Sequence, residues 1–222
     1  MGRVGTNEDV TSARLIESTV PPRPEGLVLV LHGGASRPGR TTVSPAQLSV
    51  LRMVPVARRV GRAGRGRLAV LRLLNSHRGW DTTHTPVDDV AWALGELRGR
   101  LGPLPTCLVG HSLGGRAALL AGGQDDVRGV VALNPWVYPH DDADLTGRRV
   151  LIVHGADDRV APPGRSRAVA RTLARRADVE YVEVAGGKHA MLRHGARFER
   201  AAADFAVETL LGDPRHDGRA AR

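Results

Sequence analysis

Short apolar runs recur along the chain, separated by longer segments in which apolar residues return every three or four positions. Residues 27–31 (LVLVL) are apolar without interruption, as expected of a strand buried on both faces of a sheet. Comparable runs occupy residues 68–74, 106–109, 127–133, 150–153 and 179–184. Two glutamates interrupt the last run, which is more typical of an edge strand. The alternation of strands and helices predicts an α/β fold, with a mostly parallel central sheet and helices on both faces.

Several of the intervening segments carry signals for the start of a helix. Ser44-Pro45-Ala46-Gln47 combines a capping serine, a proline at the first helical position and a glutamine that can reach back to the cap. Thr85-Pro86 repeats this pattern, and one apolar helical face follows it (Val87, Val90, Leu94, Leu97 and Leu101). Further helices are predicted at residues 116–121, after Pro162-Pro163, and around residues 198–205.

The chain contains no internal repeat and no composition typical of an interdomain linker. Its 222 residues suit one domain with a core of its own. We expect a single domain over residues 1–222, with its core at about residues 26–211 and a short polar connection at residues 134–147. Residues 1–9 and 212–222 are expected to be flexible ends.

The net charge of +9 does not by itself indicate a nucleic-acid binder. All 32 basic residues except Lys188 are arginines, and they are spread along the whole chain. The densest basic stretch, residues 58–72, lacks the aromatic residues that would stack on bases. The lone Cys107 excludes an intrachain disulfide, and no segment has the roughly 20 apolar residues of a membrane span. We therefore expect a soluble cytoplasmic protein that binds neither nucleic acid nor membrane.

The stretch Gly110-His111-Ser112-Leu113-Gly114 matches the nucleophile-elbow pattern G-x-S-x-G. In such an elbow a strand turns so sharply into a helix that side chains two residues before and after the serine would collide. The context is the required one, because an apolar run precedes the motif and an alanine- and leucine-rich helical segment follows it. Ser112 is therefore the candidate nucleophile.

A serine hydroxyl needs a base to take its proton and an acid to orient that base. The segment after the run at 150–153 supplies aspartates, and the segment after 179–184 supplies His189. Serine, then aspartate, then histidine is the chain order of this triad type. In an open parallel sheet all three would meet outside the carboxyl ends of the strands.

Four motifs in order, LVLVLHGG, GHSLGG, HGADDRVAPP and GGKHAML, resemble those of the α/β-hydrolase-fold family, and the resemblance covers roughly residues 26–211. It implies an α/β-hydrolase fold and a serine hydrolase. In that family the acid commonly occupies the last place of G-x-x-D, which points to Asp158, with Asp157 as the competitor. A variant of the family carries the acid after the preceding strand, where three aspartates lie (Asp141, Asp142 and Asp144).

The tetrahedral intermediate of acyl transfer needs backbone N–H groups around its oxyanion. One donor is expected to be Leu113, directly after the nucleophile and at the start of a helix. The resemblance places the second donor at Gly34, in the segment His32-Gly33-Gly34-Ala35, although Ala35 is equally compatible with the sequence. His32 itself is expected to have a structural role.

Hydrolases of this fold often insert a cap domain where this chain has only residues 134–147. The resemblance thus implies a shallow, open site for a small-molecule ester or acyl substrate, or for the exposed end of a larger molecule. Trp80, Trp136 and Tyr138 are candidate pocket residues. The expected reaction is hydrolysis of carboxylic esters or thioesters. The alternatives are amide or peptide hydrolysis and a non-catalytic binding protein. No histidine shows metal-ligand spacing and no phosphate loop is present, so neither a metal nor a cofactor is expected; the oligomeric state stays open.

Overall fold

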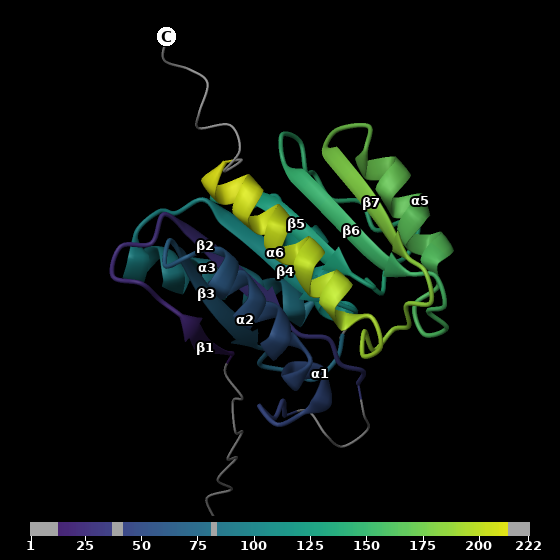
Figure 1. Ribbon diagram of the computed structural model, residues 1–222, viewed down its shortest axis with the longest axis horizontal. Helices are drawn as coiled ribbons and strands as arrows, with labels where there is room; N and C mark the ends of the chain where they lie inside the picture. Colours follow the sequence, from purple (N-terminus) through teal and green to yellow (C-terminus); the bar gives the residue numbers. More distant parts are fainter. Residues whose placement is uncertain (1–12, 37–41, 81–83, 213–222) are drawn as a thin grey trace, which may run out of the picture.

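The computed structural model describes residues 13–36, 42–80 and 84–212 of the chain. Within these residues seven strands form one sheet, in the order β1-β3-β2-β4-β5-β6-β7 (Figure 1). Neighbouring strands are parallel except β1 and β3. The strands are β1 (Arg14–Thr19), β2 (Gly26–Leu31), β3 (Leu68–Leu74), β4 (Thr106–His111), β5 (Val127–Leu133), β6 (Arg149–Gly155) and β7 (Asp178–Val184). The predicted mostly parallel sheet is thus confirmed, with β7 at an edge.

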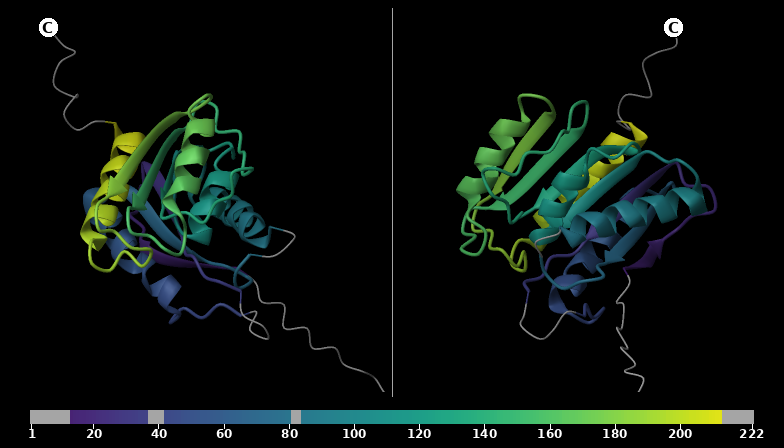
Figure 2. Two further views of the ribbon diagram at one scale, coloured as in Figure 1. Left: turned by 90° about the vertical axis from the view of Figure 1, so that its right-hand side faces the viewer. Right: turned by 180° about the vertical axis from the view of Figure 1, so that it is seen from behind.

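Helices cover both faces of the sheet (Figures 1 and 2). Helices α2 and α6 pack on one face, and α3, α4 and α5 pack on the other. The helices are α1 (Leu48–Leu51), α2 (Met53–Ala63), α3 (Thr85–Leu101), α4 (Leu113–Ala121), α5 (Pro163–Leu173) and α6 (Gly195–Leu211). The predicted flexible ends, apart from Gly212, lie outside the described residues.

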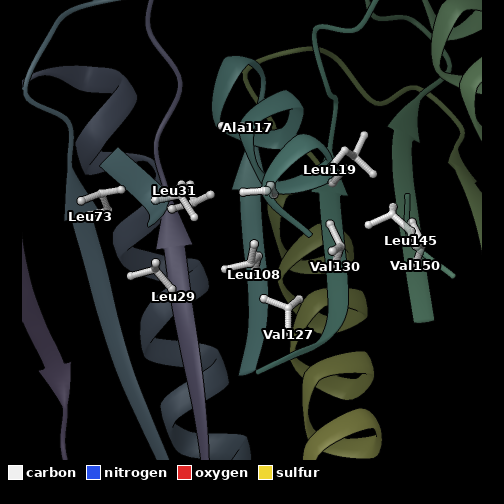
Figure 3. Packing of buried hydrophobic residues seen from close by; sticks show 14 of the residues in the cluster. Leu29, Leu31, Leu73, Leu108, Ala117, Leu119, Val127, Val130, Leu145 and Val150 are labelled. Atoms are coloured by element: carbon white, nitrogen blue, oxygen red, sulfur yellow. The ribbon is translucent and has the colours of Figure 1, made fainter. Parts of the chain in front are cut away.

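The continuous apolar runs form the central strands because each strand is buried on both faces. In β2, Leu29 and Leu31 belong to the core under α3, α4 and α5, whereas Val28 and Val30 belong to the core under α2 and α6. Successive side chains of a strand point to opposite faces, so both positions must be apolar. Figure 3 shows Leu29 and Leu31 beside Leu108 of β4, in the first of these cores.

The fold begins earlier than the predicted core boundary at residue 26, because β1 pairs antiparallel with β3. This strand reads RLIEST, and only Leu15 and Ile16 are apolar. An edge strand needs few apolar residues, because it pairs along one side only and is partly open to solvent. Pairing with β3, rather than its own pattern, decides its structure.

The helix predicted from Ser44 begins later. The Ser44 hydroxyl accepts the N–H of Ala46 at 3.3 Å, and the Ser44 carbonyl accepts the N–H of Gln47 at 3.0 Å, which closes a turn. Helix α1 then starts at Leu48. Serine offers the same local hydrogen bonds to a turn as to a helix N-terminus, so the pattern did not distinguish the two. No helix within the described ranges has both the length and the apolar character needed to cross a bilayer.

Candidate active site

Ser112 lies in a strained turn between β4 and α4. Its backbone angles are φ 57° and ψ −120°, a conformation that non-glycine residues rarely adopt. Its N–H donates to the Leu133 carbonyl at 3.0 Å, and its carbonyl accepts the N–H groups of Arg116 and Trp136 at 3.1 and 3.0 Å. These bonds from β5, from the β5–β6 connection and from α4 hold the turn and compensate for its strain.

The glycines of the motif are required by close backbone approach. A Cβ atom on Gly110 would lie 2.1 Å from the carbonyl oxygen of Gly114. One on Gly114 would lie 2.5 Å from the carbonyl oxygen of His32, at the end of β2. Real Cβ atoms do not come so close to backbone, so the predicted collision within the turn is confirmed for Gly110, whereas Gly114 is required by the approach of the end of β2.

The structure brings together the three residues predicted as nucleophile, base and acid. The Nε2 atom of His189 lies 3.0 Å from the Ser112 hydroxyl oxygen. The Nδ1 atom of the same ring lies 2.8 Å from Oδ2 of Asp158. An ionised carboxylate only accepts hydrogen bonds, so Nδ1 carries the proton and Nε2 is left to accept the proton of Ser112.

Asp158 is held in the ionised form by its surroundings. Its Oδ1 accepts the N–H groups of Val160 and Ala161 at 2.8 and 2.9 Å, and His154 Nε2 lies 3.3 Å from its Oδ2. Burial alone would raise the pKa of Asp158, but hydrogen bonds from His154, from His189 and from the Ala161 backbone outweigh burial and hold it well below its usual range. A permanent negative charge therefore faces His189.

The other candidate acids lie elsewhere. Asp157 is exposed, although it is adjacent to Asp158 in the chain. Asp141 pairs with Arg116, Asp142 pairs with Arg176, and Asp144 accepts hydrogen bonds from Thr146. The geometry therefore favours Asp158 over all four alternatives as the partner of His189.

The loops that carry Asp158 and His189 touch each other through glycines. A Cβ atom on Gly155, at the end of β6, would lie 2.4 Å from the backbone of Gly187. The Asp157 N–H donates to the Gly187 carbonyl at 2.9 Å, two residues before His189. This contact fixes the spacing between the acid and the base.

Two residues that the sequence analysis did not assign to the site hold the backbone of His189. The buried Asn134, in a positive-φ conformation at the end of β5, donates through Nδ2 to the His189 carbonyl at 3.1 Å and accepts the Gly155 N–H at 2.8 Å. The ring of His111 donates from Nε2 to the same carbonyl at 2.8 Å. Burial, followed by the neighbouring His189, lowers the pKa of His111 to about 3, so this ring stays neutral. The only sequence signal for Asn134 is its position directly after a buried strand.

The segment after β2 lies against the elbow, as an oxyanion loop requires. A Cβ atom on Gly33 would meet the His111 carbonyl oxygen and the Ser112 Cβ, both at 2.9 Å. Gly34 has a φ of +146°, a conformation open to glycine but strained for other residues. Leu113 is the first residue of α4, where N–H groups have no partner within the helix. Gly34, Ala35 and Leu113 all line the same cavity as Ser112.

That cavity has a volume of about 500 Å³, in the range of small-molecule sites. The predicted pocket residues Trp80, Trp136 and Tyr138 all line it. His32, by contrast, is buried: its Nε2 accepts the Asn75 N–H at 3.2 Å and burial lowers its pKa, which agrees with a structural role.

Two arginines also line the cavity, and the sequence analysis singled out neither. Arg116 on α4 forms a bidentate pair with Asp141, with distances of 2.8 and 2.7 Å, and its guanidinium lies over the rings of Trp80 and Tyr138. The Tyr138 N–H also donates to Asp141, at 2.9 Å. This pair fastens the β5–β6 connection to α4 beside Ser112. Arg52 lies between α1 and α2.

Within the described residues no group of three or more histidine, cysteine, aspartate or glutamate side chains is placed to bind a metal ion. Cys107 is buried in β4, and burial raises the pKa of its thiol to about 12. The cavity presents the hydroxyl of Ser112 beside His189, and the buried carboxylate of Asp158 contacts the far side of that ring.

Comparisons with known proteins agree with this geometry. A model of the alpha/beta hydrolase family matches residues 104–199, which include the elbow, Asp158 and His189. No curated protein sequence matches the chain significantly.

Solved structures extend the similarity to most of the chain. Est1E from Butyrivibrio proteoclasticus matches with a TM-score of 0.67 at 17% identity, covering 90% of this chain and 94% of that protein. An α/β serine hydrolase without a lid from Xanthomonas campestris matches with a TM-score of 0.65 at 16% identity, covering 89% and 94%. A monoacylglycerol lipase from Paleococcus ferrophilus matches with a TM-score of 0.64 at 18% identity, covering 89% and 99%. At these identities the similarity establishes a shared fold, not a shared substrate.

Proposed function

The chain is an α/β-hydrolase-fold protein, and we propose that it is a serine hydrolase that cleaves small carboxylic esters or thioesters through an acyl-enzyme on Ser112. One observation carries the proposal: Ser112, His189 and Asp158 form a continuous hydrogen-bonded chain, and Ser112 and His189 line the cavity. The esterase PE8 and the monoacylglycerol lipase among the structural neighbours have names that agree with ester hydrolysis.

The proposed reaction follows from the positions of these atoms. His189 Nε2 takes the proton of Ser112 as the hydroxyl oxygen attacks the ester carbonyl. The N–H groups of Leu113 and Gly34 stabilise the oxyanion, and the charge of Asp158 stabilises the protonated imidazole. His189 then gives its proton to the departing alcohol or thiol. Water, deprotonated by the same histidine, releases the acid and restores Ser112.

The short β5–β6 connection favours esters over amides. Residues 134–148, between β5 and β6, contain neither helix nor strand, so no inserted domain is built from them. The cavity, of about 500 Å³, therefore suits a small substrate.

Labelling with a fluorophosphonate probe tests the nucleophile. The wild-type protein should be labelled, the Ser112→Ala variant should not, and Ser49→Ala should still be labelled although Ser49 lines the same cavity. The wild type should also hydrolyse para-nitrophenyl esters of short acyl chains. Absence of Ser112-dependent labelling would contradict the proposal, and labelling without turnover of any ester would favour amide chemistry.

The role of Asp158 is tested by comparison with its neighbour. Asp158→Asn should lower kcat by about 10³- to 10⁴-fold, because the imidazole loses the carboxylate that sets its tautomer. Asp157→Asn, at an exposed position, should change kcat less than twofold. Equal losses in the two variants would remove Asp158 from the proposed mechanism.

A further inference from the structure

The cavity beside Ser112 is lined by cationic but not by anionic side chains. Two arginines, Arg52 and Arg116, belong to its lining. None of the described aspartate or glutamate side chains lines the cavity. The nearby Asp158 is separated from it by the ring of His189. A site built for a neutral ester has no need of such a charge pattern.

The charge of Arg116 is already compensated. Its guanidinium makes two parallel hydrogen bonds to Asp141, and the two side chains are 9% and 7% exposed. Asp141 occupies the Nε–Nη2 edge of this guanidinium and compensates its charge, which leaves less attraction for a second carboxylate. Arg116 therefore has a structural role in the cavity wall, which does not account for the second arginine of the lining, Arg52.

Arg52 has no such partner within the described part of the chain. It forms no ion pair there, and its Nε atom is buried without a hydrogen-bond partner. Burial lowers its pKa, and no carboxylate opposes this effect. A buried donor without a partner is unfavourable, and more so when the group is charged. The positive charge of Arg52 also contributes, after burial and His189, to the lowered pKa of His111 in the elbow.

We propose that Arg52 binds a carboxylate of the substrate, so that the preferred substrates are esters or thioesters that carry one free carboxylate in addition to the bond cleaved at Ser112. A guanidinium fork matches a carboxylate geometrically, and a carboxylate bound in the cavity would compensate a charge that no described side chain neutralises. This inference rests on the proposed function, because it assigns the substrate class of that same site.

A single carboxylate fits the cavity better than a phosphate group. The described lining offers one uncompensated cation, whereas a phosphate monoester carries a charge of about −1.5 to −2 at neutral pH. The volume of about 500 Å³ also limits the substrate to a small molecule. A half-ester of a short dicarboxylic acid, or an acyl ester of a hydroxy acid, meets both conditions.

Two matched substrate pairs test the proposal and distinguish the two sides of the ester. The mono-para-nitrophenyl ester of adipic acid is compared with para-nitrophenyl heptanoate, which places the charge on the acyl side. The para-carboxyphenyl ester of acetic acid is compared with its methyl ester, which places the charge on the leaving group. The quantity measured is the ratio of kcat/KM for the anionic and the neutral member, which cancels any loss of folded protein.

In the wild type this ratio should be at least about tenfold in favour of the anionic member of one pair, as expected for a charge-assisted hydrogen bond. It should fall to about one in Arg52→Gln and recover in part in Arg52→Lys, which keeps the charge but loses the planar fork. Arg58→Gln removes the same charge from an exposed position on α2, outside the cavity lining, and should retain the wild-type ratio.

The proposal is overturned if neither pair shows an anionic preference, or if the preference is the same in Arg52→Gln. Its failure is distinguishable from failure of the proposed function. In the first case the neutral esters are still hydrolysed and the fluorophosphonate still labels Ser112. If the proposed function itself fails, no ester is hydrolysed and the fluorophosphonate does not label Ser112.

Discussion

The Ser112 cavity has two walls that are held in different ways. The elbow wall, residues 110–114, is held by backbone atoms so closely packed that no side-chain atom fits at Gly110 or Gly114. The β5–β6 wall, formed by Trp136 and Tyr138, is held by the buried ion pair between Arg116 and Asp141. Because of this steric exclusion, no side chain is tolerated at the two glycines. The ion pair makes a finite contribution to the free energy of unfolding, which can be measured by substituting one of its partners.

This difference gives the two walls different uses. The elbow wall carries Ser112, the nucleophile of the proposed reaction, whose position such a reaction requires to be held precisely. The β5–β6 wall shapes the cavity, and the buried Arg116–Asp141 pair that attaches it to α4 could be replaced by an apolar pair without changing the fold. We therefore expect substitutions in the β5–β6 wall to change which substrates are accepted, and substitutions in the elbow wall to change the reactivity of Ser112.

The largest effect is expected for Gly110→Ala. The new Cβ would lie 2.1 Å from the Gly114 carbonyl oxygen, so the elbow must open. We expect the free energy of unfolding to fall by at least about 4 kcal/mol, with loss of Ser112 labelling. Urea unfolding followed by circular dichroism measures the change.

Gly95→Ala is the matched control for this prediction. Gly95 is an interior residue of α3, and nothing lies within 4 Å of the position of an added Cβ. The same substitution should raise the free energy of unfolding by about 0.5–1 kcal/mol, because alanine favours the helix. Similar effects at the two glycines would mean that backbone contact does not hold the elbow wall.

A smaller effect is expected for Asp141→Asn in the attachment of the β5–β6 wall. The substitution leaves the Arg116 guanidinium buried without a charged partner, and it should lower the free energy of unfolding by about 3 kcal/mol. Asp142→Asn breaks the neighbouring pair with Arg176, whose side chains are about half exposed, and should change it by less than about 1 kcal/mol. If both variants lost the same small amount in urea unfolding, the buried pair would not be what holds this wall.

The smallest effect concerns the pH dependence of the elbow wall. The folded protein keeps His111 neutral down to a pKa of about 3, whereas an unfolded chain protonates it near its ordinary value of 6.5. As the pH falls from 6.5 towards 3, the unfolded state binds a proton that the folded state does not, so stability decreases. Between pH 7 and pH 5, His111 should account for a loss of about 2 kcal/mol.

Comparison of the wild type with His111→Gln isolates this contribution. Urea unfolding at pH 7 and at pH 5 gives the change in stability for each protein, and the change should be about 2 kcal/mol smaller in the variant. Identical changes in the two proteins would show that His111 is not kept neutral by its burial.

Much of the fold was predictable because its signals are local. The central strands are largely buried on both faces, so predominantly apolar runs mark β2 to β6 within two residues of their ends. Gly110 is required by the carbonyl oxygen of Gly114, only four residues away, so this part of the motif predicts the turn locally, whereas Gly114 is required by the approach of His32 at the end of β2. Strand β1 was missed because an edge strand of sequence RLIEST has little apolar pattern and owes its structure to its pairing with β3.

The site divides in the same way. The sequence alone determined the order of Ser112, the aspartates and His189 and placed each after a strand, because strand ends and chain order are properties of local pattern. Only the tertiary structure decided that Asp158 rather than Asp157 meets His189, that Asn134 and His111 hold the His189 backbone, and that Arg116 is paired while Arg52 is not. These outcomes depend on which side chains, distant in sequence, come within hydrogen-bonding distance, and no local period or spacing encodes that distance.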